Sequence, residues 1–239
     1  MQDKWELLLS CEHASNRVPH DIRGQHAGDL LTSHVAWDPG SEEIARRLGD
    51  KLGVRPLIAE WSRLVVDLNR SPDNPEVVPE NAFGENVPWN TALPEAARAS
   101  RIRQYHQPYW NAASEQVGDC LDRGTRVIHL GVHSFTPIYR GVPRHVDIGL
   151  LFDPARTREA KFAELLRRHM DPSGLMVRYN EPYDGRSDGI GQAFRSRYPE
   201  DSYVHIEFEV NQRVCADIPR IVEALGVAIL QLPLASAHR

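Results

Sequence analysis

The amino-acid sequence predicts an α/β fold, with residues 1–239 forming a single three-layer domain around a mostly parallel central sheet. Two observations predict this fold. Short runs rich in strand-forming residues alternate with longer runs whose apolar residues recur at helical spacing. No low-complexity linker or internal repeat divides the chain, and a chain of this length can bury one substantial core.

The first part of the chain contains three expected strands and one expected helix. The helix covers residues 41–52, because Ile44, Leu48 and Leu52 recur at helical spacing and Gly53 can end it. The strands are expected at residues 5–11, 55–59 and 64–67.

The middle and the second half continue the same alternation. Residues 71–94 contain five prolines and no periodic pattern, so we expect a functional lid or a mobile segment there. A helix is expected over residues 93–121, interrupted near Pro108, because proline lacks an amide proton and crowds the preceding turn. Further strands are expected at residues 126–132, 148–152 and 203–210, and further helices at 157–169 and 218–230.

The composition argues against some partners and locations. With 28 basic and 33 acidic side chains and a net charge of −5, the chain has no broad positive field for nucleic acid. The apolar run near the N-terminus is too short for a secretory signal, and no stretch approaches a membrane span. We therefore expect a cytoplasmic protein with no membrane partner. Three cysteines without C-x-x-C spacing are expected to be buried thiols: Cys11, Cys120 and Cys215.

Two histidines follow expected strands, where open α/β sheets place their ligands. His13 comes just after the first strand, and His133 directly follows the strand at residues 126–132. Neutral imidazoles from two strand ends can meet as metal ligands. An isolated His13 would more often bond the backbone at a turn, but the pair favours a metal site. His129, inside the strand, is expected to lie in the core.

A catalytic zinc normally has three protein ligands and one open position for water, so the histidines need a third side chain. Asp38 is the first candidate. The alternative is that Asp38 caps the following helix, since Asp before Pro39 is a frequent helix start, although Ser41 can supply that cap instead. Other candidates for the third ligand are His34, Glu12 and Asn16.

If such a metal site hydrolyses an amide, the reaction also needs a base that takes a proton from water and passes it to the leaving nitrogen. Strand alternation over residues 203–210 places acidic side chains on one face and apolar side chains on the other. Glu209 is the first candidate base and Glu207 the second, because buried acids are costly unless they are paired or functional. The alternative is an edge strand with a solvated acidic face.

Asn69 and Arg70, after another apolar run, are suited to bind a substrate carboxylate, since a guanidinium grips it through two charge-assisted hydrogen bonds. Arg63 is a second candidate anchor. The alternative is a local ion pair between Asp67 and Arg70 that closes a turn. The turn-rich segment around Tyr183 is expected to border the same pocket.

Six motifs, spread over nearly the whole chain, contain these residues: Glu12-His13-Ala14-Ser15-Asn16-Arg17-Val18-Pro19, His34-Val35-Ala36-Trp37-Asp38-Pro39-Gly40, Asp67-Leu68-Asn69-Arg70, His133-Ser134-Phe135, Asn180-Glu181-Pro182-Tyr183 and Glu209-Val210-Asn211-Gln212. In this combination the chain resembles the N-formylglutamate amidohydrolase family, within the zinc-exopeptidase and phosphorylase/hydrolase-like folds. The resemblance implies Asn69 and Arg70 as carboxylate binders, His133 as a metal ligand and Glu209 as the base. Zinc carboxypeptidases have a glutamate ligand where this chain has Asn16, so we expect Asp38 to replace it.

These observations lead us to expect a metal-dependent amidohydrolase that cleaves an N-acyl amino acid, such as N-formyl-L-glutamate, to formate and the free amino acid. Its partner would be a small molecule that carries a carboxylate. Zinc is the expected metal, and iron, manganese or cobalt fit the same ligands. The alternatives are a zinc exopeptidase or deacylase acting on a peptide or cell-wall fragment, and a non-catalytic anion-binding module.

Overall fold

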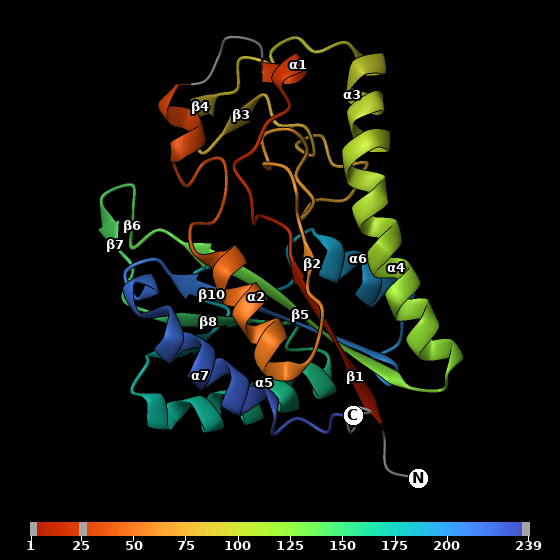
Figure 1. Cartoon of the computed structure of the whole chain (residues 1–239), viewed down its shortest axis with the longest axis vertical. Coiled ribbons are helices and arrows are strands. Elements are labelled where there is room, and N and C mark those ends of the chain that lie inside the picture. Colours follow the sequence, from red (N-terminus) through yellow and green to blue (C-terminus); the bar gives the residue numbers. More distant parts are fainter. Residues whose placement is uncertain (1–3, 24–27, 236–239) are drawn as a thin grey trace.

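The computed structural model describes residues 4–23 and 28–235. Its central sheet consists of β1 (Trp5–Cys11), β2 (Leu57–Ile58), β5 (Arg126–Phe135), β8 (Ile148–Leu151), β9 (Val177–Tyr179) and β10 (Tyr203–Asn211). The strand order is β2-β1-β5-β10-β8-β9 (Figure 1). All neighbouring strands are parallel except β10 and β8, which pair antiparallel. The predicted α/β class with a mostly parallel sheet is confirmed.

Helices cover both faces of the sheet, so the fold has three layers (Figure 1). One layer contains α2 (Ser41–Leu52), α5 (Thr157–Met170) and α7 (Ile218–Ile229), in which α7 packs against both α2 and α5. The other contains α4 (Gln107–Asp122) and α6 (Ile190–Arg197), which contact each other through Trp110 and Phe194, 6.2 Å apart between ring centroids.

The two faces of the sheet differ in chemistry because successive strand residues point to opposite sides. On β10, Ile206, Phe208 and Val210 are fully buried on the apolar side. The opposite side carries polar groups, and His129 there bonds both Ser10 and Tyr203 at 2.7 Å. His129 is fully buried, as predicted. Glu207 and Glu209 lie on this polar side, near the carboxyl ends of the parallel strands β5 and β10.

The long helical segment after residue 94 is interrupted near Pro108, as the sequence predicts. It consists of α3 (Glu95–Arg101), a π-helical turn η2 (Ile102–His106) and α4. Pro108 lies in the first turn of α4, directly after the π-helical turn, where it lacks the amide proton that would continue the helical bonding. The remaining short helices are α1 (His20–Arg23), η1 (Asp29–Thr32), η3 (Asp171–Ser173) and η4 (Cys215–Asp217).

Two expectations about strands are corrected. Residues 64–65 form a turn and residues 66–67 have no regular structure. The amide of Val65 bonds the carbonyl of Ser62 and the amide of Asp67 bonds the carbonyl of Val77, so neither amide pairs with a neighbouring strand. The expected strand at 55–59 is reduced to its two central residues in β2. The alternative of an edge strand for the glutamates is excluded, since β10 lies between β5 and β8.

Residues 71–94 belong to a small lobe beyond the carboxyl end of β1 (Figure 1). The segment contains a hairpin of β3 (Asn81–Ala82) and β4 (Glu85–Asn86). A second hairpin, β6 (Ile138–Tyr139) and β7 (Val142–Pro143), follows β5. The small lobe has its own apolar cluster of Val35, Ala36, Leu64, Ala82, Val87 and Trp89.

No helix among residues 4–23 and 28–235 is long and apolar enough to cross a membrane.

Candidate active site

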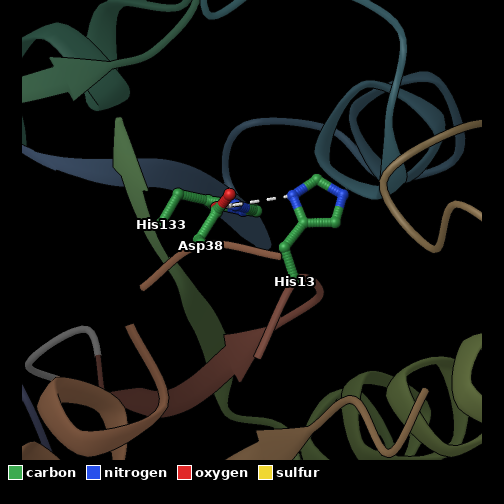
Figure 2. Close-up of side chains that lie close together, drawn as sticks. All are labelled: His13, Asp38 and His133. Atoms are coloured by element: carbon green, nitrogen blue, oxygen red, sulfur yellow. Dashed lines mark hydrogen bonds and ion pairs between the residues drawn. The ribbon is translucent and has the colours of Figure 1, made fainter. Parts of the chain in front are cut away.

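The three predicted metal ligands meet at the carboxyl ends of the parallel strands. His13 follows β1, Asp38 precedes α2 and His133 lies on β5, and each offers one ligand atom within 4.8 Å of the others (Figure 2). All three are buried. One detail is corrected: β5 continues to Phe135, so His133 lies inside the strand near its end and does not follow it.

The carboxylate of Asp38 is the centre of this cluster. Its Oδ2 is 3.1 Å from Nδ1 of His133 and 3.5 Å from Nδ1 of His13, and its Oδ1 accepts a hydrogen bond from Arg63. The side chain of Asp38 does not cap α2. Instead, the Ser41 hydroxyl donates to the backbone carbonyl of Asp38 at 2.8 Å, which leaves the carboxylate directed at the histidines.

A further carboxylate lies behind each histidine ring. Nε2 of His13 is hydrogen-bonded to Oδ1 of Asp67 at 2.7 Å. Nε2 of His133 is 3.0 Å from Oε2 of Glu12, an ion-pair contact without hydrogen-bond geometry. The two Nδ1 atoms therefore face the Asp38 carboxylate. Two imidazoles and one carboxylate are the donor set of many catalytic zinc sites, so these residues fit a divalent cation.

The charges around the cluster shift its pKa values. Burial, with a smaller contribution from the Arg63 guanidinium, lowers the pKa of His13 to about 4, which keeps this ring neutral as a metal ligand must be. Burial alone would raise the pKa of Asp67, but the hydrogen bond from His13 and the charges of Arg63 and Arg70 outweigh it and lower that pKa. Burial would likewise lower the pKa of His133, yet Glu12 raises it to about 10.

The other candidates for the third ligand lie outside the cluster. Glu12 contacts Nε2 of His133, whereas Asp38 contacts Nδ1 of the same ring. The side-chain amide of Asn16 donates to the carbonyl of Leu31 at 2.8 Å. His34 borders the cavity, with its ring 5.5 Å from that of Phe83.

The two glutamates of β10 have different environments. Glu209 pairs in register with His133, and its Oε2 is buried with no hydrogen-bond partner among the described residues. Burial, assisted by the charge of Glu207, raises the pKa of Glu209 to about 7. Glu207 bonds His205 at 3.1 Å, and this bond overcomes the effect of burial and lowers its pKa to about 2. Of the two, Glu209 is the one suited to exchange protons near neutral pH.

A cavity of about 340 Å³ contains these groups. It is lined by the three first-choice metal ligands, both candidate bases and the candidate substrate-binding residues: His13, Asp38, Arg63, Asn69, Arg70, His133, Tyr183, Glu207 and Glu209. The segment 71–94 also contributes to its wall, with Glu76, Pro79, Asn81, Ala82 and Phe83.

The predicted carboxylate binders retain donors for a ligand. Oδ1 of Asn69 accepts from the amide of Ile190 at 3.3 Å, which orients the side-chain amide and leaves its Nδ2 donors. Arg70 is 4.0 Å from Asp67 and 3.8 Å from Glu76, longer than direct hydrogen bonds. The principal side-chain partner of Asp67 is His13 and not Arg70.

Two contacts near the site were not predicted from the sequence. In the first, the Asp67 carboxylate accepts a hydrogen bond from His13, and the only signal for it is that Asp67 lies in the same motif as Asn69. In the second, the Asp188 carboxylate accepts from the amide and hydroxyl of Ser71 and from Asn74 at 2.6 Å. Asp188 thereby ties the start of segment 71–94 to the loop before α6, and no spacing in the sequence indicated it.

The chain is similar to known proteins in sequence and in fold. A crystal structure of the gene product Atu2144 from Agrobacterium tumefaciens is 31% identical over 95% of this chain and 91% of that chain, with a TM-score of 0.81. The structure of N-formylglutamate amidohydrolase from Ralstonia eutropha JMP134 has the same fold, with 19% identity, coverage of 97% and 93%, and a TM-score of 0.73. No curated protein sequence matches. The family model described as N-formylglutamate amidohydrolase matches residues 5–216, and the chain therefore belongs to the N-formylglutamate amidohydrolase family.

Proposed function

We propose that this protein is a metal-dependent amidohydrolase that cleaves an N-acyl amino acid, with N-formyl-L-glutamate as the first candidate. The observation that carries the proposal is the convergence of His13, Asp38 and His133 in the same cavity as the buried carboxyl of Glu209. Membership of the family supports an amide bond as the target. The unpartnered oxygen of Glu209 argues against a purely structural or anion-binding role, because an unpaired buried polar group is costly.

In the proposed mechanism, His13, Asp38 and His133 would hold the cation. A bound zinc would supply a Lewis acid that polarises the acyl carbonyl and lowers the pKa of coordinated water. Glu209 accepts a proton from the attacking water and later passes it to the leaving nitrogen. The C–N bond breaks, one water is consumed, and formate and the free amine leave.

The remaining residues of the cavity orient the substrate. Arg70 and the Nδ2 group of Asn69 bind the free carboxylate of the amino acid, which fixes the acyl group relative to Glu209. Arg63 already bonds Asp38, so we assign it to the metal ligand first and to the substrate second. Tyr183 borders the cavity and accepts from Arg144 at 3.1 Å.

The wall formed by segment 71–94 favours a small substrate. Pro79, Ala82 and Phe83 from this segment line the same cavity as the metal-ligand candidates. Asp188 holds the segment in this place through Ser71 and Asn74. A peptide or cell-wall fragment would need a more open groove, so the exopeptidase alternative is less well supported.

Zinc stoichiometry and formate release from N-formyl-L-glutamate, measured on the same samples, test the proposal. We expect wild type to bind one zinc and release formate, and His133→Ala to lose both. His169→Ala is the matched control, since His169 lies on α5 and does not line the cavity. Zinc without formate release would keep the metal site but reject the formyl substrate. Absence of both from wild type would overturn the proposal.

A further inference from the structure

The end of β1 supplies a second acidic side chain beside the metal-ligand candidates. Glu12 directly precedes His13 and is 1% exposed. Its Oε2 is 3.0 Å from Nε2 of His133, and its Oε1 accepts from the Tyr109 hydroxyl at 3.0 Å. The carboxylate is thus held between helix α4 and the imidazole of the neighbouring strand. A carboxylate this deeply buried is tolerated only when such partners satisfy it.

We propose that Glu12 is a positioning residue whose charge keeps a proton on Nε2 of His133 and so leaves Nδ1 of that ring for the metal. The inference deepens the proposed function and rests on its metal site. A carboxylate behind a ligand imidazole selects one tautomer, orients the ring and makes the ligand nitrogen more basic. Asp67 lies behind His13 in the corresponding place, where the contact is a hydrogen bond of 2.7 Å, whereas Glu12 and His133 form an ion pair.

The geometry separates this role from that of a direct metal ligand. The two nitrogens of an imidazole point in different directions. In His133, Nε2 faces Glu12, whereas Nδ1 faces Asp38 at 3.1 Å. His13 also presents its Nδ1 to Asp38, at 3.5 Å. The ligand atoms of the cluster therefore lie on the Nδ1 side of the His133 ring, and Glu12 lies on the other side.

Metal affinity of the full chain, stripped with a chelator and reloaded, tests the role of Glu12. Zinc affinity is measured by competition with a chromophoric chelator, and Co²⁺ absorption reports the coordination. For Glu12→Gln we expect zinc affinity about 10- to 100-fold weaker than wild type, with the Co²⁺ coordination number retained. Glu6→Gln is the matched control, because Glu6 lies on β1, which Glu12 directly follows, but bonds Arg123 and Thr125. Its affinity should equal that of wild type.

A second variant keeps the test valid if Glu12→Gln does not fold. Tyr109→Phe removes one hydrogen bond from the Glu12 carboxylate and retains its charge. Its zinc affinity should be weaker than that of wild type, because the carboxylate that positions His133 loses one of the contacts that fix it.

The outcomes distinguish the two proposals. Wild-type zinc affinity in both Glu12→Gln and Tyr109→Phe would overturn the positioning role and leave the metal site standing. A Co²⁺ spectrum that shows one ligand fewer in Glu12→Gln would make Glu12 a direct ligand and also overturn it. Failure of wild type itself to bind zinc would overturn both proposals. Weaker zinc binding with unchanged coordination supports the inference, because a merely structural ion pair would change folding stability alone.

Discussion

The substitution Glu209→Gln tests the electrostatic account of the cavity in the metal-free protein. Glu209 is 6% exposed, and burial raises its pKa from 4.5 to about 7. The folded state therefore holds a proton more strongly than the unfolded state. This contribution to stability is complete below pH 4.5 and is lost as the pH rises through about 7. At about 1.4 kcal/mol per pH unit, the loss amounts to about 3 kcal/mol.

A glutamine at this position is neutral at every pH and has no such loss. We expect the free energy of unfolding of Glu209→Gln, relative to wild type, to increase by about 3 kcal/mol between about pH 4.5 and pH 8. Urea unfolding of chelator-treated protein over a pH series measures it. An equal difference between the two proteins at both ends of the series would refute the reasoning.

Glu207→Gln serves as the control with opposite sign. Its hydrogen bond with His205 lowers the pKa of Glu207 to about 2, against the effect of burial. The stability that this carboxylate contributes is present above its unfolded pKa of 4.5 and is lost as the pH falls through about 2. Glu207→Gln should therefore be less stable than wild type near neutral pH, where Glu209→Gln should be more stable.

The same Glu209→Gln protein tests the proposed base. Removing a general base typically lowers the rate by about 10²- to 10⁴-fold, so formate release should fall by that factor. Zinc content should equal that of wild type, because Glu209 is outside the cluster of ligand candidates. Loss of zinc from this variant would instead identify Glu209 as a ligand.

Three further substitutions test the surroundings of the site. Asp67→Asn removes the charge behind His13, and competition titration should show zinc binding about 10- to 100-fold weaker. Arg70→Gln should raise KM for N-formyl-L-glutamate and leave KM for an uncharged N-formyl amide unchanged; an equal effect on both substrates would contradict its role. Gly191→Ala would place a Cβ in steric overlap with the buried His205 ring, so urea unfolding should show a loss of about 1–3 kcal/mol, and wild-type stability would contradict the close packing.

Much of the fold was predictable because it follows from local patterns. The bounds of β1 and α2 agree with those predicted, since their apolar spacing and terminal residues are contained in the segments themselves. Residues 64–67 have an equally apolar pattern but form no strand. The amide of Asp67 bonds Val77, and the carbonyl of Leu64 accepts from Trp89 and Asn90. Partners outside the segment leave no trace in its local pattern.

The sequence by itself determined the chemical inventory of the site: histidines near strand ends, an acidic face on a strand, and an Asn-Arg pair after an apolar run. Only the tertiary structure decided how these groups divide the work. In the folded chain the Asp38 carboxylate faces the histidines and Glu12 lies behind His133. One carboxyl oxygen of Glu209 has no hydrogen-bond partner among the described residues. The physical reason is that hydrogen-bond partners and burial arise between strands far apart in the chain, whereas composition and spacing report only which side chains are available.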